Sequence, residues 1–134
     1  MTEPAQKLAS VTATSPEQCD ELITAALNAG DVEAALDLYE ADASFIPEPG
    51  VIATGKEAIR QIMSEFVALK PSLTLEVLSV TQSSGLALLK SHWQLNGTDP
   101  DGNPVQLNGN GVEVVRQQPD GQWLFVIDSP YGAD

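Results

Sequence analysis

The sequence Pro71-Ser72-Leu73-Thr74-Leu75-Glu76-Val77 marks the point at which the hydrophobic spacing of the chain changes. Before it, apolar residues recur every three or four positions, which is typical of amphipathic helices. From Leu73 onward they alternate with polar residues, which is typical of half-buried strands. Helices followed by strands predict an α+β fold, in which the helices pack on one face of an antiparallel sheet.

Three helices are predicted before this point: residues 16–29, residues 32–40, and a helix that follows a capping box at 54–57 and stops at Pro71. Ser15 is a good N-cap for the first helix, and Gly30 is suited to end it. A short strand at 45–46 and a turn at 47–50 lie between the second and third helices. Four strands with hairpin-sized loops are predicted afterwards: residues 73–77, 86–95, 105–116 and 123–128.

Length and composition predict one domain over residues 15–134, preceded by a disordered tail over residues 1–14. Leu, Ile, Val and Phe account for 35 of the 134 residues, which is enough to build a core. Cys19 and His92 are the only residues of their types, which excludes a disulfide framework and a multi-histidine metal centre. We therefore expect no metal and no cofactor.

The charge balance limits the partners of the protein. Six basic and 19 acidic residues give a formal net charge of −13. Such a surface repels phosphate backbones and anionic lipids, so neither nucleic acid nor a membrane is an expected partner. The N-terminus lacks the apolar core of a secretory signal, and we expect a cytoplasmic protein.

Two glycines interrupt the strand predicted at 105–116. Gly109 and Gly111 favour either a sharp bend of the sheet or the close approach of a ligand. Strand alternation places Glu113 on the same, concave face. A carboxyl group buried there is a candidate acid or base near neutral pH, and the alternative is a Glu that reaches a backbone donor or lies at an open mouth.

Alternation in the last strand leaves the direction of Asp128 open. Leu124, Val126 and Asp128 share one face, and the more apolar set Trp123, Phe125 and Ile127 shares the other. Burial alone therefore favours an outward Asp128. In the strand at 86–95, the same reasoning points Trp93 inward and His92 outward.

The chain also resembles a known family over residues 16–131. The stretch Gly-Asp-Val-Glu-Ala-Ala-Leu-Asp-Leu-Tyr-Glu-Ala-Asp-Ala-Ser-Phe at 30–45 is similar to the opening of the SnoaL-like and ketosteroid-isomerase-like group of the NTF2-like superfamily. Thr-Gly-Lys-Glu-Ala-Ile at 54–59 looks like the helix start of that group. Val-Glu-Val-Val-Arg at 112–116, followed by Pro-Asp-Gly-Gln-Trp at 119–123, looks most like the SgcJ/EcaC-type branch.

The resemblance implies a cone-shaped α+β barrel in which three N-terminal helices pack on a strongly curved antiparallel sheet. It also implies a pocket between helices and sheet, and a homodimer formed through the sheet. It turns Asp128 toward the pocket, which would leave Trp123, Phe125 and Ile127 as the dimer interface. The catalytic positions of ketosteroid isomerases fall on Ile23, Pro47 (beside Glu48) and Glu113, so true steroid isomerase activity is disfavoured.

Two functions follow as hypotheses. The first is a cofactor-independent acid–base enzyme, an isomerase, cyclase or dehydratase acting on a small hydrophobic carbonyl compound. Its catalytic candidates are Glu113, Asp128 and Glu48, and its ligand-binding candidates are Trp93, Tyr39, Ile23, Val126 and Phe66. The second is a non-catalytic module of the same fold that binds a small molecule or dimerises.

Overall fold

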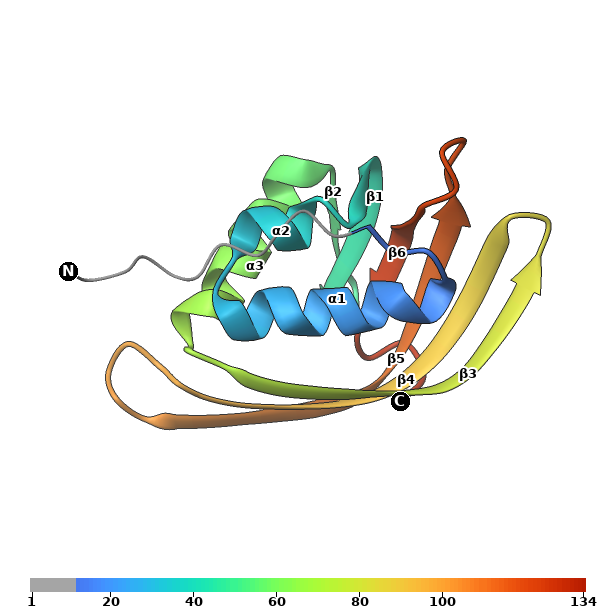
Figure 1. The fold of residues 1–134 in the computed structure, drawn as a ribbon. Helices are drawn as coiled ribbons and strands as arrows, with labels where there is room; N and C mark the ends of the chain where they lie inside the picture. The colour runs from blue at the N-terminus through green and yellow to red at the C-terminus, as the bar shows by residue number, and fades with distance from the viewer. Residues whose placement is uncertain (1–11) are drawn as a thin grey trace.

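The computed structural model describes residues 12–134, which form three helices and six strands (Figure 1). The helices are α1 (Pro16–Ala29), α2 (Val32–Leu36) and α3 (Lys56–Ala68). The strands are β1 (Tyr39–Glu48), β2 (Val51–Thr54), β3 (Ser72–Ser83), β4 (Leu86–Thr98), β5 (Pro104–Gln117) and β6 (Trp123–Ser129). The predicted order of helices followed by long strands is confirmed.

The strands form one sheet in the order β2-β1-β6-β5-β4-β3. All neighbouring pairs are antiparallel except β1 and β6, which run parallel. In Figure 1 the long strands β3, β4 and β5 curve beneath α1, so the sheet wraps around the helices as one side of an α+β cone. Helix α1 packs most extensively on β3, and α3 packs on β1 and α2. This arrangement leaves the concave face of the sheet covered by helices.

The second predicted helix is too long, because α2 ends at Leu36 and Tyr39 already begins β1. The spacing of Val32, Ala35, Leu36 and Tyr39 suits a helix, but pairing with β6 decides the conformation at Tyr39. The backbone N–H of Phe125 donates to the carbonyl oxygen of Leu38 at 2.7 Å, and Tyr39 is in register with Phe125. Tertiary strand pairing therefore overrides the local helical pattern.

Strand β2 is absent from the sequence prediction, and β1 is longer than the two residues expected. The two strands form a hairpin in which Glu48 is in register with Val51. The intervening turn contains Gly50 at φ +85°, a left-handed conformation that glycine adopts without strain. The capping box expected at 54–57 is also wrong, since Gly55 is the N-cap of α3 and no side chain caps it.

A β-bulge in β6 sets the direction of Asp128. Glu113 is in register with Asp128 and Val114 with Ile127, but Val115 is in register with Phe125, so Val126 is the extra residue. Phe125 and Asp128 consequently both point inward, and they are 0% and 8% exposed. The expectation that an inward Asp128 would expose Trp123 and Phe125 as a dimer interface is therefore wrong.

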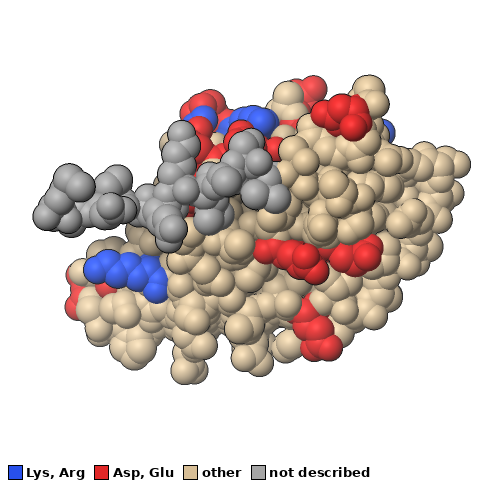
Figure 2. Space-filling model, in the orientation of Figure 1, with Lys and Arg blue, Asp and Glu red and all other residues tan. Residues whose placement is uncertain are grey.

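The start of the described chain is part of the fold. Ala13 is 1% exposed and forms an isolated bridge with Trp123. Most of the tail predicted over residues 1–14 lies outside the described residues. Among residues 12–134, no helix is long and apolar enough to cross a membrane. Figure 2 shows acidic side chains spread over the face drawn, with basic side chains in small, separate places.

Candidate functional site

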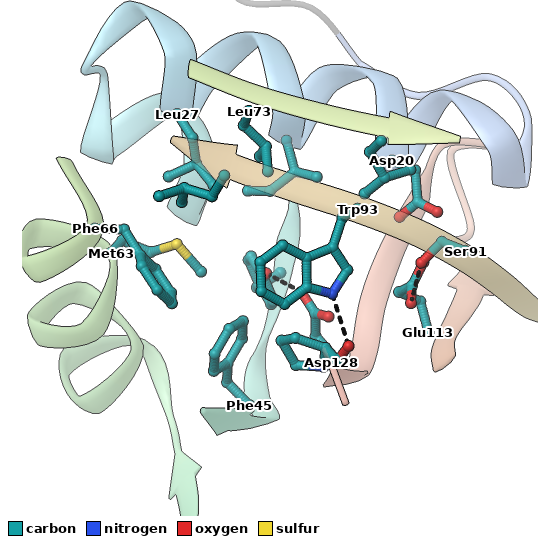
Figure 3. A pocket seen from close by; sticks show the side chains of 15 residues that line it. Asp20, Leu27, Phe45, Met63, Phe66, Leu73, Ser91, Trp93, Glu113 and Asp128 are labelled. Carbon is teal, nitrogen blue, oxygen red and sulfur yellow. Dashed lines mark hydrogen bonds between the residues drawn. The ribbon is translucent and has the colours of Figure 1, made fainter. Parts of the chain in front are cut away.

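A cavity of about 70 Å³ lies between the helices and the concave face of the sheet. Its walls come from every layer of the fold, and they are mainly apolar. Figure 3 shows the side chains that line it: Asp20, Ile23, Leu27, Tyr39, Phe45, Met63, Phe66, Leu73, Leu75, Ser91, Trp93, Leu95, Glu113, Asp128 and Pro130. We call this space the inner cavity.

Three carboxyl groups gather in the inner cavity. Glu113 on β5 and Asp128 on β6 are directly opposed in register, so their side chains leave neighbouring strands on the same face. Asp20 reaches them from α1, and it is completely buried. In Figure 3 its carboxyl group points toward Ser91 and Glu113, away from the cluster of Leu27, Met63 and Phe66. One side of the cavity is therefore acidic and the other apolar.

The hydrogen bonds of these acids are incomplete. Ser91 Oγ donates to Glu113 Oε2 at 3.1 Å, and the Tyr39 hydroxyl donates to Asp128 Oδ2 at 2.5 Å. Both carboxyl oxygens of Asp20, and Oε1 of Glu113, have no hydrogen-bond partner of ordinary geometry within residues 12–134. Buried polar atoms without partners are rare in proteins, and they mark this end of the cavity as a polar site that can accept further hydrogen bonds.

Burial raises the pKa of all three carboxyl groups above the ordinary value. Desolvation, together with the interaction with Asp20 and the charge of Asp20, raises the pKa of Glu113 to about 10, although the hydrogen bond from Ser91 partly offsets this effect. Desolvation also raises the pKa of Asp20 to about 7, although the interaction with Glu113 partly offsets this effect. At neutral pH the Asp20–Glu113 pair therefore holds one proton between its carboxyl groups, on the Glu113 side.

Asp128 has an intermediate character. Desolvation and the nearby Glu113 raise its pKa to about 7, and the hydrogen bond from Tyr39 lowers it. Tyr39 itself is 1% exposed, and desolvation followed by the charge of Asp128 raises its pKa well above the ordinary value. The phenol thus remains a hydrogen-bond donor to Asp128 over the whole neutral range.

Replacing Tyr39 with Phe is expected to raise the pKa of Asp128 above about 7, because the only donor to its carboxylate among the described residues is lost. Carboxyl-carbon NMR across a pH series measures this value directly. Tyr131→Phe is the matched control, since Tyr131 lines the neighbouring hollow and makes no hydrogen bond to Asp128. An Asp128 pKa that falls or stays constant in Tyr39→Phe would contradict the assignment.

The two glycines of β5 make room for this site. A Cβ atom on Gly111 would lie 2.7 Å from both Glu113 Oε2 and Ser91 Oγ. A Cβ atom on Gly109 would lie 2.9 Å from Tyr131 Cδ1 and 3.0 Å from a ring carbon of Trp93. The sequence suggested the close approach of a ligand as one explanation, but the groups that approach these two glycines belong to the chain itself.

The C-terminal residues hold Trp93 in place at the edge of the cavity. The indole N–H of Trp93 donates to the carbonyl oxygen of Pro130 at 2.7 Å, and the rings of Trp93 and Tyr131 meet edge to face at 5.3 Å. A second hollow of about 540 Å³, the outer hollow, shares Phe66, Trp93 and Pro130 with the inner cavity. The two spaces are therefore neighbours with a common wall.

The structure separates the residues singled out in the sequence. The inner cavity contains six of them: Ile23, Tyr39, Phe66, Trp93, Glu113 and Asp128. Glu48 lines the outer hollow instead and is exposed, because it is the last residue of β1. Val126 lines neither of these two spaces, since the bulge leaves it unpaired and half-buried.

Asp20 and Ser91 were missed as site residues. Asp20 lies three and seven positions before Ile23 and Leu27, so it is on the buried stripe of α1. A charged residue on an otherwise apolar stripe was the available signal.

The outward direction predicted for His92 is confirmed, and its ring nitrogen lies 3.1 Å from Asn110 Oδ1. Within residues 12–134, no three side chains of metal-binding type are placed to hold an ion together.

Known structures share this fold. A ketosteroid isomerase-like protein from Erwinia carotovora atroseptica is 19% identical, with a TM-score of 0.74, over 84% of this chain and 89% of that one. A candidate dehydratase of the NTF2-like family from Streptomyces avermitilis is 17% identical, with a TM-score of 0.72, over 87% and 94%. An NTF2-like protein with a cystatin-like fold from Novosphingobium aromaticivorans is 18% identical, with a TM-score of 0.70, over 87% and 80%.

No curated protein matches the chain closely enough to count as a relative. The sequence pattern of the SnoaL-like domain, however, matches residues 20–126, most of the chain. The matched region contains α1 from Asp20 onward, the curved sheet up to the bulge, and two of the three buried acids. The chain therefore belongs to the SnoaL-like domain family and has the NTF2-like α+β fold.

Proposed function

We propose that the protein is a cofactor-independent acid–base enzyme that moves a proton within a small hydrophobic carbonyl compound. The observation that carries this proposal is the set of three buried carboxyl groups that open on an apolar cavity. Groups with pKa values near neutrality transfer protons most effectively at neutral pH. Perturbed acids clustered in a cleft are typical of such sites.

The acids divide into two roles. Asp128, with a pKa of about 7, is the base that accepts a proton from the carbon next to the carbonyl group. Glu113, with a pKa of about 10, remains protonated and donates to the carbonyl oxygen as the enol forms. Asp20 is the ionised member of its pair with Glu113 in the resting state. The reverse transfers return the ketone and restore both acids.

The substrate must be small at its reacting end. The inner cavity of about 70 Å³ admits a carbonyl group and a few neighbouring carbons, whereas a bulkier apolar portion fits the outer hollow. Glu48 would meet only that outer portion, as a polar group at the mouth. The rings of Phe66 and Trp93 border both spaces, so they would contact the substrate along its length.

Exchange of carbon-bound hydrogen in D₂O tests the proposal without knowledge of the natural reaction. We expect the protein to accelerate exchange next to the carbonyl group of small ketones such as cyclohexanone and 2-decalone, as followed by proton NMR. The exchange rate should increase as pH rises through about 7, where Asp128 ionises. Rates equal to buffer alone on every ketone of such a panel would overturn the proposed activity.

A separate observation favours association through the outer face of the sheet. Leu88, Val114 and Ile127 lie in one row across β4, β5 and β6, on the face opposite the inner cavity. Leu88 is 39% exposed and Ile127 is 40% exposed. An apolar row in the middle of a sheet is a natural contact for a second copy of the chain. We propose a homodimer through this row.

Replacing Leu88 with Glu is expected to convert the dimer to a monomer, because two copies would place carboxylates against an apolar partner surface. Light scattering coupled to size-exclusion chromatography measures the mass. Ile52→Glu is the matched control, since Ile52 is 66% exposed on the edge strand β2, at the other end of the sheet from Leu88. A wild-type protein that is monomeric at micromolar concentration would contradict the association.

A further inference from the structure

We propose that the inner cavity binds the ammonium head of a small lipophilic primary amine. The claim concerns binding alone, so it goes beyond the proton transfer described above and does not depend on it. It rests on three features of the cavity wall: its buried acids, its orphaned oxygen atoms and its aromatic rings. Each of them suits a cation that carries N–H groups.

The first feature is the one-sided charge of the wall. Asp20, Glu113 and Asp128 line the cavity, and no Lys, Arg or His of the described residues does so. A site built for a carboxylate or a phosphate contains basic groups or converging backbone N–H groups, and this one presents acids. The formal net charge of −13 extends the same preference to the surroundings, because a negative field concentrates cations near the protein.

The second feature is the set of unsatisfied acceptors. Asp20 Oδ1 and Asp20 Oδ2 are buried and have no hydrogen-bond partner within residues 12–134, and Asp20 is the ionised member of its pair with Glu113. A primary ammonium carries three N–H donors, so it can satisfy both oxygens at once. A quaternary ammonium has none and would leave the oxygens unpaired. The orphaned oxygens thus select the type of amine and not merely its charge.

The third feature is the aromatic content of the same wall. Tyr39, Phe45, Phe66 and Trp93 all line the cavity, and together they include most of the aromatic residues of the chain. Aromatic faces attract ammonium groups, and Trp does so most strongly. The hydrogen bond from Trp93 to Pro130 fixes the indole before any ligand arrives. Preorganisation of this kind lowers the entropy lost on binding.

The shape of the two spaces defines the rest of the ligand. The inner cavity of about 70 Å³ holds the ammonium and the first carbons attached to it. Phe66, Trp93 and Pro130 border the outer hollow as well, so the proposal places an apolar tail against these residues. A flexible two-carbon link between ammonium and ring meets both requirements, and 2-phenylethylamine is the simplest probe.

Isothermal titration calorimetry at pH 8 compares four probes that differ mainly in the head group: 2-phenylethylamine, its trimethylammonium analogue, 2-phenylethanol and phenylacetate. We expect the primary amine to bind at least tenfold more tightly than the alcohol and the trimethylammonium compound, and phenylacetate to give no signal. Equal affinity for amine and alcohol, or measurable binding of phenylacetate, would overturn the proposal.

Binding below pH 7 should release protons. The titratable groups that face Asp20 are Glu113 from β5, Asp128 from β6, Tyr39 from β1 and Cys19 beside it on α1. An ammonium favours the ionised carboxylates, so its arrival drives protons from the acids into the buffer. Calorimetry at pH 6.5 in phosphate and in MES, which differ in ionisation enthalpy and contain no primary amine, separates this release from the binding heat. No difference between the two buffers would contradict the ammonium site.

The variant Asp20→Asn assigns the binding to this cavity. It removes the charge and replaces one of the two acceptor oxygens with an N–H donor, and we expect the affinity for 2-phenylethylamine to fall at least tenfold. Asp101→Asn makes the same change of net charge on an exposed loop and should leave the affinity unchanged. An equal loss of affinity in both variants would show that the negative field of the whole protein attracts the amine, and it would overturn the proposed site. Amine binding without hydrogen exchange would contradict only the proposed enzyme.

Discussion

Replacing Asp20 with Asn is expected to stabilise the protein by about 2 kcal/mol at pH 8.5. The carboxylate of Asp20 is completely buried and has no hydrogen-bond partner among residues 12–134, so its ionised form opposes folding. Each unit of pKa difference between folded and unfolded chain corresponds to about 1.4 kcal/mol, and the pKa of Asp20 rises from 3.8 to about 7. Asparagine keeps the shape but still buries a polar amide, which reduces the gain.

The pH dependence gives this prediction its sign. A raised pKa means that the folded chain retains a proton that the unfolded chain has released. The contribution of Asp20 therefore favours the folded state most below about pH 4, and it is lost as the pH rises to about 7. Ionisation of Asp128 lowers the free energy of unfolding over the same pH range. Ionisation of Glu113 lowers it further as the pH rises toward about 10. The advantage of Asp20→Asn should accordingly vanish near pH 4.

Urea unfolding at pH 4 and pH 8.5 measures both quantities. Asp101→Asn is again the matched control, and we expect it to change the free energy of unfolding by less than ~0.5 kcal/mol at either pH. An Asp20→Asn variant that is less stable than the wild type at pH 8.5 would mean that the carboxylate has a strong partner in solution. The premise that the buried Asp20 carboxylate has no hydrogen-bond partner would then be wrong.

The sequence predicted the inward Glu113 well, because alternation along one unbroken strand needs no knowledge of the rest of the fold. Gly109, Gly111 and Glu113 lie on the buried face of β5 as the spacing indicated. Asp128 was different. Its direction depends on the bulge at Val126, and nothing in the local pattern of β6 reveals a bulge. Only the family resemblance turned it inward, and the buried Phe125 shows why burial reasoning alone failed.

Long-range pairing explains the other differences. The residues Glu40, Ala41 and Asp42 have weak strand propensity, so β1 exists because β2 and β6 flank it. Asp20 escaped notice for a related reason. Its role depends on Glu113, 93 positions away, and a single acid on a helix predicts nothing by itself. The apolar spacing of α1 identified its buried face, but it could not show that carboxyl groups of other elements lie opposite that face.

Replacing Glu113 with Gln is expected to slow the proposed hydrogen exchange by at least ~100-fold, which is the usual contribution of a general acid. Glutamine retains the size of the side chain and can still donate an N–H hydrogen bond to the carbonyl oxygen. It has no proton to transfer, however, so the enol cannot form by the route described. The rate constant should fall while the concentration of ketone required for half-saturation changes little, since binding contacts remain.

The pH profile distinguishes loss of an acid from loss of structure. The wild type should show a bell-shaped rate with limbs near pH 7 for Asp128, coupled to Asp20, and near pH 10 for Glu113. The variant should lose the upper limb alone. Glu76→Gln, on an exposed position of β3, controls for the change of charge and should keep both limbs. A Glu113→Gln protein that exchanges hydrogen at the wild-type rate would remove Glu113 from the reaction, and Asp128 with Tyr39 would then have to supply both transfers.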